Sequence, residues 1–432
     1  MIDPVLAHGV GRVYESPIPA YLYAVGAGLT VMVSFLLRAL AGDRAAVEKN
    51  RRVAGPGAAR ALATVLRIAA LVFLALLVAS AVLERQRGLT LAPLLFWVGL
   101  VVGMTTLCLL LGHAWEAADP WSTLEGFYRI EDPETETLEP PWWLGPLLLY
   151  ALFWFELVSG VGFESAGVLG AVVVYSVLVF TVRHRFGERW GLVDPLSIVF
   201  GFASATSPLA LRDDGVYYRG LGGVDRRDPM PRALFASVFV LLASTTLDNV
   251  TETVGWSSFL RSTGLDALSA ELVESLAFAA FALLFLAPFL ASVAAGGEKA
   301  RGNATVGAAA RSFGWALIPI GVAYVIAHNV PLLITGVPQL LRELADPFAL
   351  DWNLLGLREL WSGFAPSPQL VWYLEILLIV GGHVLGVLVA HRTAVRIAGD
   401  HAAAVRSQWA LTALMSVYTI ATLWLLAQPL VA

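Results

Sequence analysis

Runs of about 20 consecutive apolar residues recur from Tyr21 to the end of the sequence, and no other feature limits the fold as strongly. One such helix crosses the roughly 30 Å hydrocarbon core of a bilayer, whereas a water-soluble domain cannot bury many of them. The runs are continuous and do not alternate with polar residues, so they favour helices over the strands of a membrane barrel. With 58% hydrophobic and 14% charged residues, the 432-residue chain is predicted to be all-α, a polytopic integral membrane helix bundle in a lipid bilayer.

Ten apolar runs are predicted to be full membrane crossings. They cover residues 20–41, 61–83, 91–113, 143–159, 166–182, 233–247, 272–295, 313–336, 369–391 and 407–430. An eleventh stretch, 196–211, is apolar but short, and it is interrupted by Gly201, four Ser or Thr residues and Pro208. In the eighth crossing, Pro319, Gly321 and Pro331 favour a kink or a break, because proline removes a backbone hydrogen bond.

The distribution of basic residues decides how 196–211 is interpreted. If this stretch does not cross, the loops on one face hold 20 Lys and Arg residues and those on the other hold 6; if it crosses, the split is 12 against 14. Because Lys and Arg concentrate in cytoplasmic loops, we predict ten crossings with both termini outside the cytoplasm. The stretch 196–211 is then a re-entrant or interfacial element on the cytoplasmic side. The scarcity of lysine, present only at Lys49 and Lys299, favours a prokaryotic cell membrane protein.

The chain, 1–432, is predicted to form a single transmembrane domain, since no polar segment is long enough for a soluble one. Five crossings followed by five would give halves 1–182 and 233–432 of opposite orientation, joined by a cytoplasmic segment, 183–232. Many secondary transporters are built from such inverted repeats. The two halves show no convincing sequence similarity, so the repeat remains one of two alternatives.

Ionisable side chains within spans are the first candidates for function, because they are costly in lipid and usually face the bundle interior. Counting about 1.5 Å per residue from the cytoplasmic ends places four of them at one level, about 20–25 Å along their helices. These four come from four different spans: Glu156, Asp248, His328 and Glu375. Polar residues within about one turn of this level are predicted to line a cavity. They are Thr245, Thr246, Asn249, Tyr324 and Asn329.

His383 is a further candidate, because it follows Gly381 and Gly382, where another backbone can approach closely. Carboxylates together with imidazole suit a divalent metal such as Zn, Mn or Fe. They equally suit a proton or sodium relay, in which a carboxylate and a histidine exchange the charge. The third alternative is that each group only makes a polar contact between helices.

Sequence motifs that would name a chemistry are missing: there is no P-loop, dinucleotide-binding glycine motif, nucleophile elbow, HExxH or paired CxxC. Arg226 and Arg227 are balanced by neighbouring aspartates, so nucleic acid is not an expected partner. The expected partners are the lipid bilayer and a small-molecule or ion ligand.

Several stretches together resemble a family of multi-pass prokaryotic membrane proteins labelled fenitrothion hydrolase. They are Ser16-Pro17-Ile18-Pro19, Asp119-Pro120-Trp121, Ser244-Thr245-Thr246-Leu247-Asp248, Ala323-Tyr324-Val325-Ile326-Ala327-His328, Gly382-His383 and Ala390-His391. The resemblance runs over nearly the whole chain and implies hydrolysis of an organophosphate ester. In that reading, a metal held by His328 and the carboxylates Asp248, Glu156 or Glu375 would activate water.

The sequence therefore leaves three hypotheses. The first is a secondary-transporter-like protein that moves a small solute or ion through the carboxylate and histidine layer. The second is a membrane-embedded, metal-dependent hydrolase. The third is a membrane scaffold or accessory subunit without catalytic activity.

Overall fold

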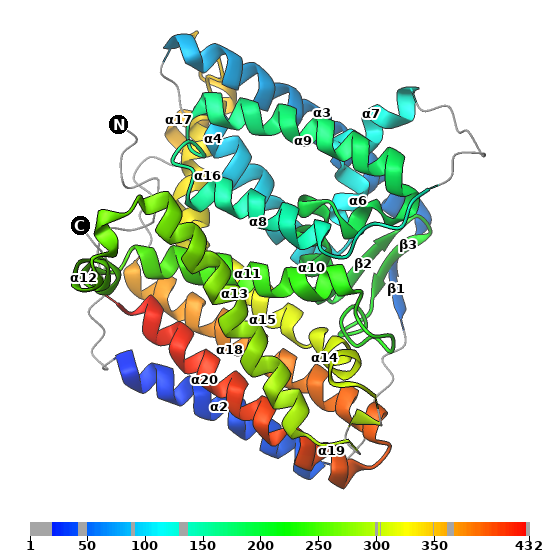
Figure 1. Cartoon of the computed structure of the whole chain (residues 1–432). Helices are drawn as coiled ribbons and strands as arrows, with labels where there is room; N and C mark the ends of the chain where they lie inside the picture. Colours follow the sequence, from blue (N-terminus) through cyan, green and yellow to red (C-terminus); the bar gives the residue numbers. More distant parts are fainter. Residues whose placement is uncertain are drawn as a thin grey trace. The chain divides into compact units, whose positions relative to one another are not determined.

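The computed structural model describes residues 20–41, 50–87, 91–128, 137–298, 301–302, 304–348, 350–360 and 367–428. These residues fold almost entirely into helices, with one small three-stranded sheet among them (Figure 1). The stretch 16–19 and both chain ends, whose predicted place is outside the cytoplasm, fall outside the described residues.

Within the described residues, eight helical stretches are long and apolar enough to cross a membrane, or nine if one bent pair counts as a single span. The eight are Tyr21–Leu40, Pro56–Leu83, Leu91–Leu111, Ser165–Thr206, Arg232–Thr251, Ala270–Ala295, Pro368–Ala398 and Trp409–Leu426. The helix predicted at 143–159 is shorter, at Leu144–Leu157. The all-α prediction is confirmed and the helices are compatible with a multi-pass membrane protein, whereas the number of ten crossings stays a prediction.

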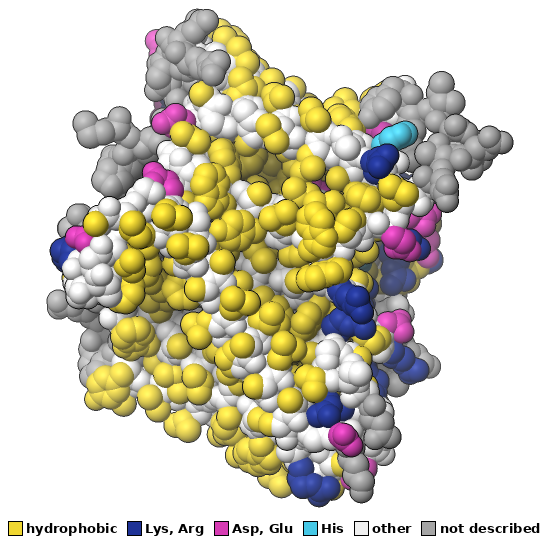
Figure 2. Space-filling view, viewed as in Figure 1, with side chains coloured by type: hydrophobic (Ala, Val, Ile, Leu, Met, Phe, Trp, Pro, Cys, Tyr) yellow, Lys and Arg dark blue, Asp and Glu magenta, His cyan; other side chains and the backbone are white. Residues whose placement is uncertain are grey.

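The surface of the long helices is apolar as well as the interior. On α3 (Pro56–Arg87), Val65, Ile68 and Val72 are each more than half exposed and recur at helical spacing. Hydrophobic side chains predominate on the face drawn in Figure 2. A water-soluble protein rarely exposes such extended apolar area, whereas lipid tails would cover it without cost.

The chain packs into two compact units, each built from segments that are distant in the sequence. Unit 1 contains Asn50–Gly220 and Pro331–Ser367, and unit 2 contains the first described helix together with Leu221–Val330 and Pro368–Ala432. This division does not follow the predicted halves 1–182 and 233–432. Whether the chain is one transmembrane domain with inverted halves stays a prediction.

Unit 1 is formed by helices and three short strands. Its helices are α3, α4 (Leu91–Pro93), the π-helix η1 (Leu94–Gly103), α5 (Met104–Leu111), α6 (Ala114–Ala118), α7 (Pro120–Tyr128), α8 (Leu144–Leu157), α9 (Ser165–Phe186), the 3₁₀-helix η2 (Gly187–Leu192), α10 (Pro195–Thr206), α16 (Val330–Leu344, from Pro331 onward), η5 (Leu354–Gly356) and α17 (Leu357–Leu360).

The sheet in unit 1 changes one prediction. Strands β1 (Arg51–Ala54), β2 (Leu209–Arg212) and β3 (Gly215–Tyr218) pair antiparallel in the order β1-β3-β2. The predicted element 196–211 is therefore not a single segment: α10 ends at Thr206 and β2 begins three residues later. Pro208 lies between them and lacks the N–H that a continuing helix needs. Whether α10 re-enters the membrane stays a prediction.

The secondary-structure elements of unit 2 are all helices over its described residues. Its helices are α2 (Ala20–Ala41), α11 (Arg232–Thr251), α12 (Val254–Thr263), η3 (Leu265–Ala267), α13 (Ala270–Ala295), α14 (Val306–Gly314), α15 (Leu317–His328), α18 (Pro368–Ala398), α19 (His401–Ser407) and α20 (Trp409–Leu426).

The predicted eighth crossing, 313–336, is broken in the structure. Helices α14 and α15 meet at an angle of 47°, and α15 ends before Asn329. Pro319 is not the cause, because it occupies the first turn of α15, where the missing N–H has no intrahelical acceptor.

Glycines bring α15 and α18 into close contact in unit 2. A Cβ atom on Gly382 would lie 2.7 Å from the Pro319 oxygen, and one on Gly386 would lie 2.8 Å from the Ala316 oxygen. Small residues at such positions let two helix backbones approach closely, as is common in membrane bundles. This contact holds in place the residues that α15 and α18 contribute to the candidate site.

Candidate functional site

Asp248 and His328 form the central contact of a polar site in unit 2. Asp248 lies in the last turn of α11, and His328 is the last residue of α15. His328 Nε2 lies 2.6 Å from Asp248 Oδ2, and the His328 and Asp248 side chains are 15% and 16% exposed. The two groups can therefore share a proton across a short, partly desolvated hydrogen bond.

Further polar groups lie around this pair, among them Glu252, which interacts electrostatically with His328. Asn249, the neighbour of Asp248, donates from Nδ2 to the hydroxyl of Tyr324 at 3.3 Å and to the Thr245 carbonyl at 2.7 Å. Glu375, buried on α18, interacts electrostatically with His328. The site thus collects groups from α11, α15 and α18.

Three of the predicted cavity-lining residues mainly bond to their own helices. The hydroxyls of Thr245 and Thr246 donate to the carbonyls four residues earlier, at 3.3 and 2.8 Å. The side-chain amide of Asn329 donates to the Val325 carbonyl at 2.9 Å. Such bonds satisfy a polar side chain inside an apolar bundle without any ligand.

The two other sequence candidates come from α18 and α8. His383 is buried in α18, and its Nδ1 lies 2.9 Å from the Ile379 carbonyl of the preceding turn. Glu156 is half-buried in α8, which belongs to unit 1. The structure therefore joins Asp248 directly to His328, brings Glu375 near them, and assigns Glu156 to the other unit.

The donor set for a metal is small. Among the described residues, no group of three or more His, Cys, Asp or Glu side chains is arranged to hold a metal ion. Asp248 and His328 supply one carboxylate and one imidazole, whereas protein zinc sites use three or four ligands.

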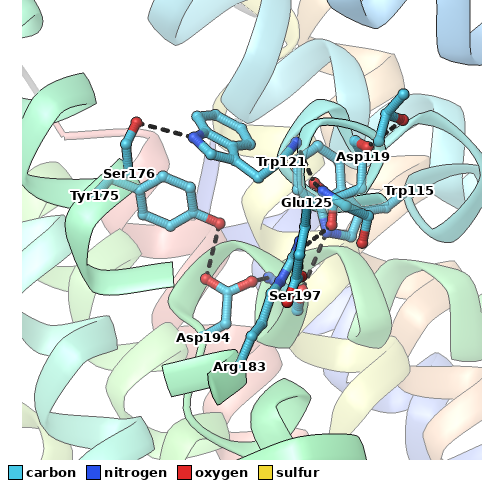
Figure 3. Close-up of polar contacts among 11 residues, drawn as sticks. Trp115, Asp119, Trp121, Glu125, Tyr175, Ser176, Arg183, Asp194 and Ser197 are labelled. Atoms are coloured by element: carbon cyan, nitrogen blue, oxygen red, sulfur yellow. Dashed lines mark hydrogen bonds and ion pairs between the residues drawn. The ribbon is translucent and has the colours of Figure 1, made fainter. Parts of the chain in front are cut away.

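A second polar centre, in unit 1, was not among the predicted site residues. Arg183, in the last turn of α9, is 2% exposed and donates to Asp119, whose side chain is equally buried. A second nitrogen of Arg183 lies 3.4 Å from Glu125 Oε2, and the Trp190 ring lies 4.1 Å from the guanidinium carbon. Two carboxylates hold the charge (Figure 3), and the aromatic face adds a cation–π contact.

The same centre extends to a second aspartate. Tyr175 and Asp194 point toward one another in Figure 3, with the tyrosine hydroxyl donating at 2.8 Å. Asp194 also accepts from the backbone N–H of Ser197 at 3.0 Å and caps α10. The indole N–H of Trp115 donates to the Ser197 hydroxyl at 3.0 Å. The tyrosine contact joins α9 to the start of α10, and the tryptophan contact joins α6 to it.

Local sequence explains the aspartates of this centre. Asp119 and Asp194 each precede a proline that opens a helix, a combination typical of helix N-termini. Asp119 Oδ1 accepts from the backbone N–H groups of Trp121 and Ser122, at 3.0 and 3.2 Å. The repeated Asp-Pro pair was the signal in the sequence, although it identifies the caps and not the arginine that binds one of them.

No family model matches this chain, and neither does any curated protein or solved structure. The resemblance to proteins labelled fenitrothion hydrolase therefore stays a prediction.

Proposed function

We propose that the protein is a secondary-transporter-like multi-pass membrane protein in which Asp248 and His328 take up and release a proton as a small solute or ion moves. The supporting observation is their 2.6 Å contact between two apolar helices. Ionisable pairs at such positions commonly mark ion and substrate pathways. The proposal includes ten crossings of a prokaryotic cell membrane with both termini outside the cytoplasm.

Charge balance favours a proton as the coupling ion. One proton converts the pair from a carboxylate with a neutral imidazole to a carboxylate with an imidazolium, so its net charge changes from −1 to 0. Both forms keep the hydrogen bond between Nε2 and Oδ2. The pair can therefore change its charge without losing its contact, which a relay station needs.

Proton flow into proteoliposomes tests this function. Purified protein is reconstituted with an enclosed pH-sensitive dye, and a potassium diffusion potential drives protons inward. We expect faster acidification than in protein-free liposomes, and loss of the excess rate in Asp248→Asn and His328→Gln. Asp266→Asn, an exposed aspartate in η3, is the matched control and should keep the wild-type rate. A wild-type rate equal to that of protein-free liposomes would refute the proposal.

The metal-dependent hydrolase has less support, because among the described residues no third His, Cys, Asp or Glu side chain is arranged with Asp248 and His328 to hold a metal ion. Metal analysis of the purified protein separates it from the transporter. Stoichiometric zinc, manganese or iron that disappears in both Asp248→Ala and His328→Ala would favour the hydrolase. A scaffold, by contrast, predicts neither metal nor proton flow.

A further inference from the structure

A small cavity lies inside unit 2. It has a volume of about 20 Å³ and is lined mostly by apolar side chains of α11, α13, α15, α18 and α20. Four of its lining residues have polar or ionisable side chains: Tyr324, His383, Tyr418 and Thr422. A space of this size holds about one water molecule, provided that polar partners are present.

His383 offers this cavity an unused hydrogen-bond acceptor. Its Nδ1 lies 2.9 Å from the Ile379 carbonyl, which can only accept, so Nδ1 carries the proton in the neutral ring. Nε2 then has a free lone pair, and this atom is buried without a hydrogen-bond partner in the structure. Leaving such an atom unpaired in an apolar interior is costly, so a bound donor would be favourable.

Tyr324 is the cavity-lining residue nearest in the sequence to either member of the proposed proton pair. It lines the cavity, and its hydroxyl accepts the hydrogen bond from Asn249, the neighbour of Asp248. Tyr324 and His328 are four residues apart on α15, hence on the same face and about 6 Å apart along the helix axis.

We propose that the cavity binds one water molecule that donates a hydrogen bond to His383 Nε2, and that His383 is a second proton-binding station through this water. The inference rests on the proposed proton-coupled function. When the station fills, the water gives a proton to Nε2 and receives one from the Tyr324 hydroxyl, which is restored by a proton from the Asp248–His328 pair. The water and the tyrosine are then unchanged, and the proton resides on the His383 imidazolium.

Nuclear magnetic resonance tests the water directly. The protein is labelled with ¹⁵N-histidine in lipid nanodiscs, and His383→Gln identifies the His383 signals. We expect a ring protonated at Nδ1 that receives magnetisation from water on the Nε2 side. A ring that receives none, or a cavity that binds xenon as dry apolar cavities do, would overturn the water site.

Proton flow tests the station separately. His383→Gln retains a side chain that can hydrogen-bond to water but removes the titrating ring, so we expect a rate as low as that of Asp248→Asn. His383→Phe, which also removes the acceptor, should give the same loss. His184→Gln, at an exposed histidine in α9, should keep the wild-type rate. Each variant must remain monodisperse with wild-type helical content.

The two proposals fail in different ways. If Asp248→Asn abolishes flow while His383→Gln leaves it at the wild-type rate, the second station is wrong and the proposed function stands. If the wild type carries no proton flow, the proposed function is wrong and the relay role of His383 falls with it, while magnetisation transfer still decides the water site.

Discussion

The strongest stability prediction concerns Arg183 in unit 1. Its side chain and that of Asp119 are each 2% exposed, and Glu125 is the second carboxylate in contact. Arg183→Met would retain most of the apolar volume but leave two carboxylates without their cation. Removing one partner of a buried ion pair typically costs about 3–5 kcal/mol. For a domain of this size, the midpoint of thermal unfolding should fall by roughly 6–20 °C.

Thermal unfolding in detergent, followed by intrinsic fluorescence, measures this effect. Asp119→Asn keeps the oxygen that caps α7 but removes the charge, so we expect the double variant to recover part of the loss. Arg189→Met is the matched control, because Arg189 pairs with Glu139 where the side chains are 54% and 77% exposed. Such surface pairs contribute at most about 1 kcal/mol. Equal shifts for Arg183→Met and Arg189→Met, or strict additivity in the double variant, would refute the reasoning.

Two smaller effects follow from other contacts. The Tyr217 hydroxyl donates to Asp214 at 2.6 Å and holds the pKa of Asp214 below its usual value. The resulting stabilisation is present above about pH 4 and is lost as the pH falls through the lower, folded-state pKa. A nuclear magnetic resonance titration of Tyr217→Phe should show that pKa returning toward the usual value. In α18, a Cβ on Gly382 would lie 2.7 Å from the Pro319 oxygen, so Gly382→Ala should destabilise unit 2 by about 1–3 kcal/mol in thermal unfolding. Gly381→Ala meets no atom within 4 Å and should be neutral or stabilising; the reverse order of the two glycine variants would contradict the packing argument.

The sequence was most informative where the signal is local. Most predicted spans fall largely on one described helix, because about 20 apolar residues in succession suffice to identify one, whereas 313–336 is divided among α14, α15 and α16. Depth along a helix is also local, since the rise per residue is fixed, and it groups Asp248 with His328, whose side chains lie 2.6 Å apart in the structure. The direction in which a side chain points around the helix axis does not follow from its depth. Thr245 and Thr246, predicted to line a cavity, donate hydrogen bonds to carbonyls of their own helix.

Sequence patterns do not predict the contacts between segments that are distant in the chain. The strand pair β1 and β3 joins residues more than 160 positions apart, and Arg52 bonds to Tyr217 across it. The sequence predicts that Arg183 belongs to the cytoplasmic segment 183–232, because a basic residue at the end of an apolar run is typical of the cytoplasmic interface. Only the fold shows that it turns inward to Asp119.

The two polar centres differ in a way that assigns them different roles. The guanidinium of Arg183 is fixed between Asp119, Glu125 and the Trp190 ring. Any change of protonation there leaves a buried charge unbalanced, so this centre suits a structural anchor for α7 and α9. Asp248 and His328 instead form a pair in which a single proton changes the net charge while the hydrogen bond persists. A buried site that must keep its charge needs an arrangement like that of Arg183. A site that must pass a proton onward needs a pair like Asp248 and His328, and the transport proposal therefore rests on unit 2.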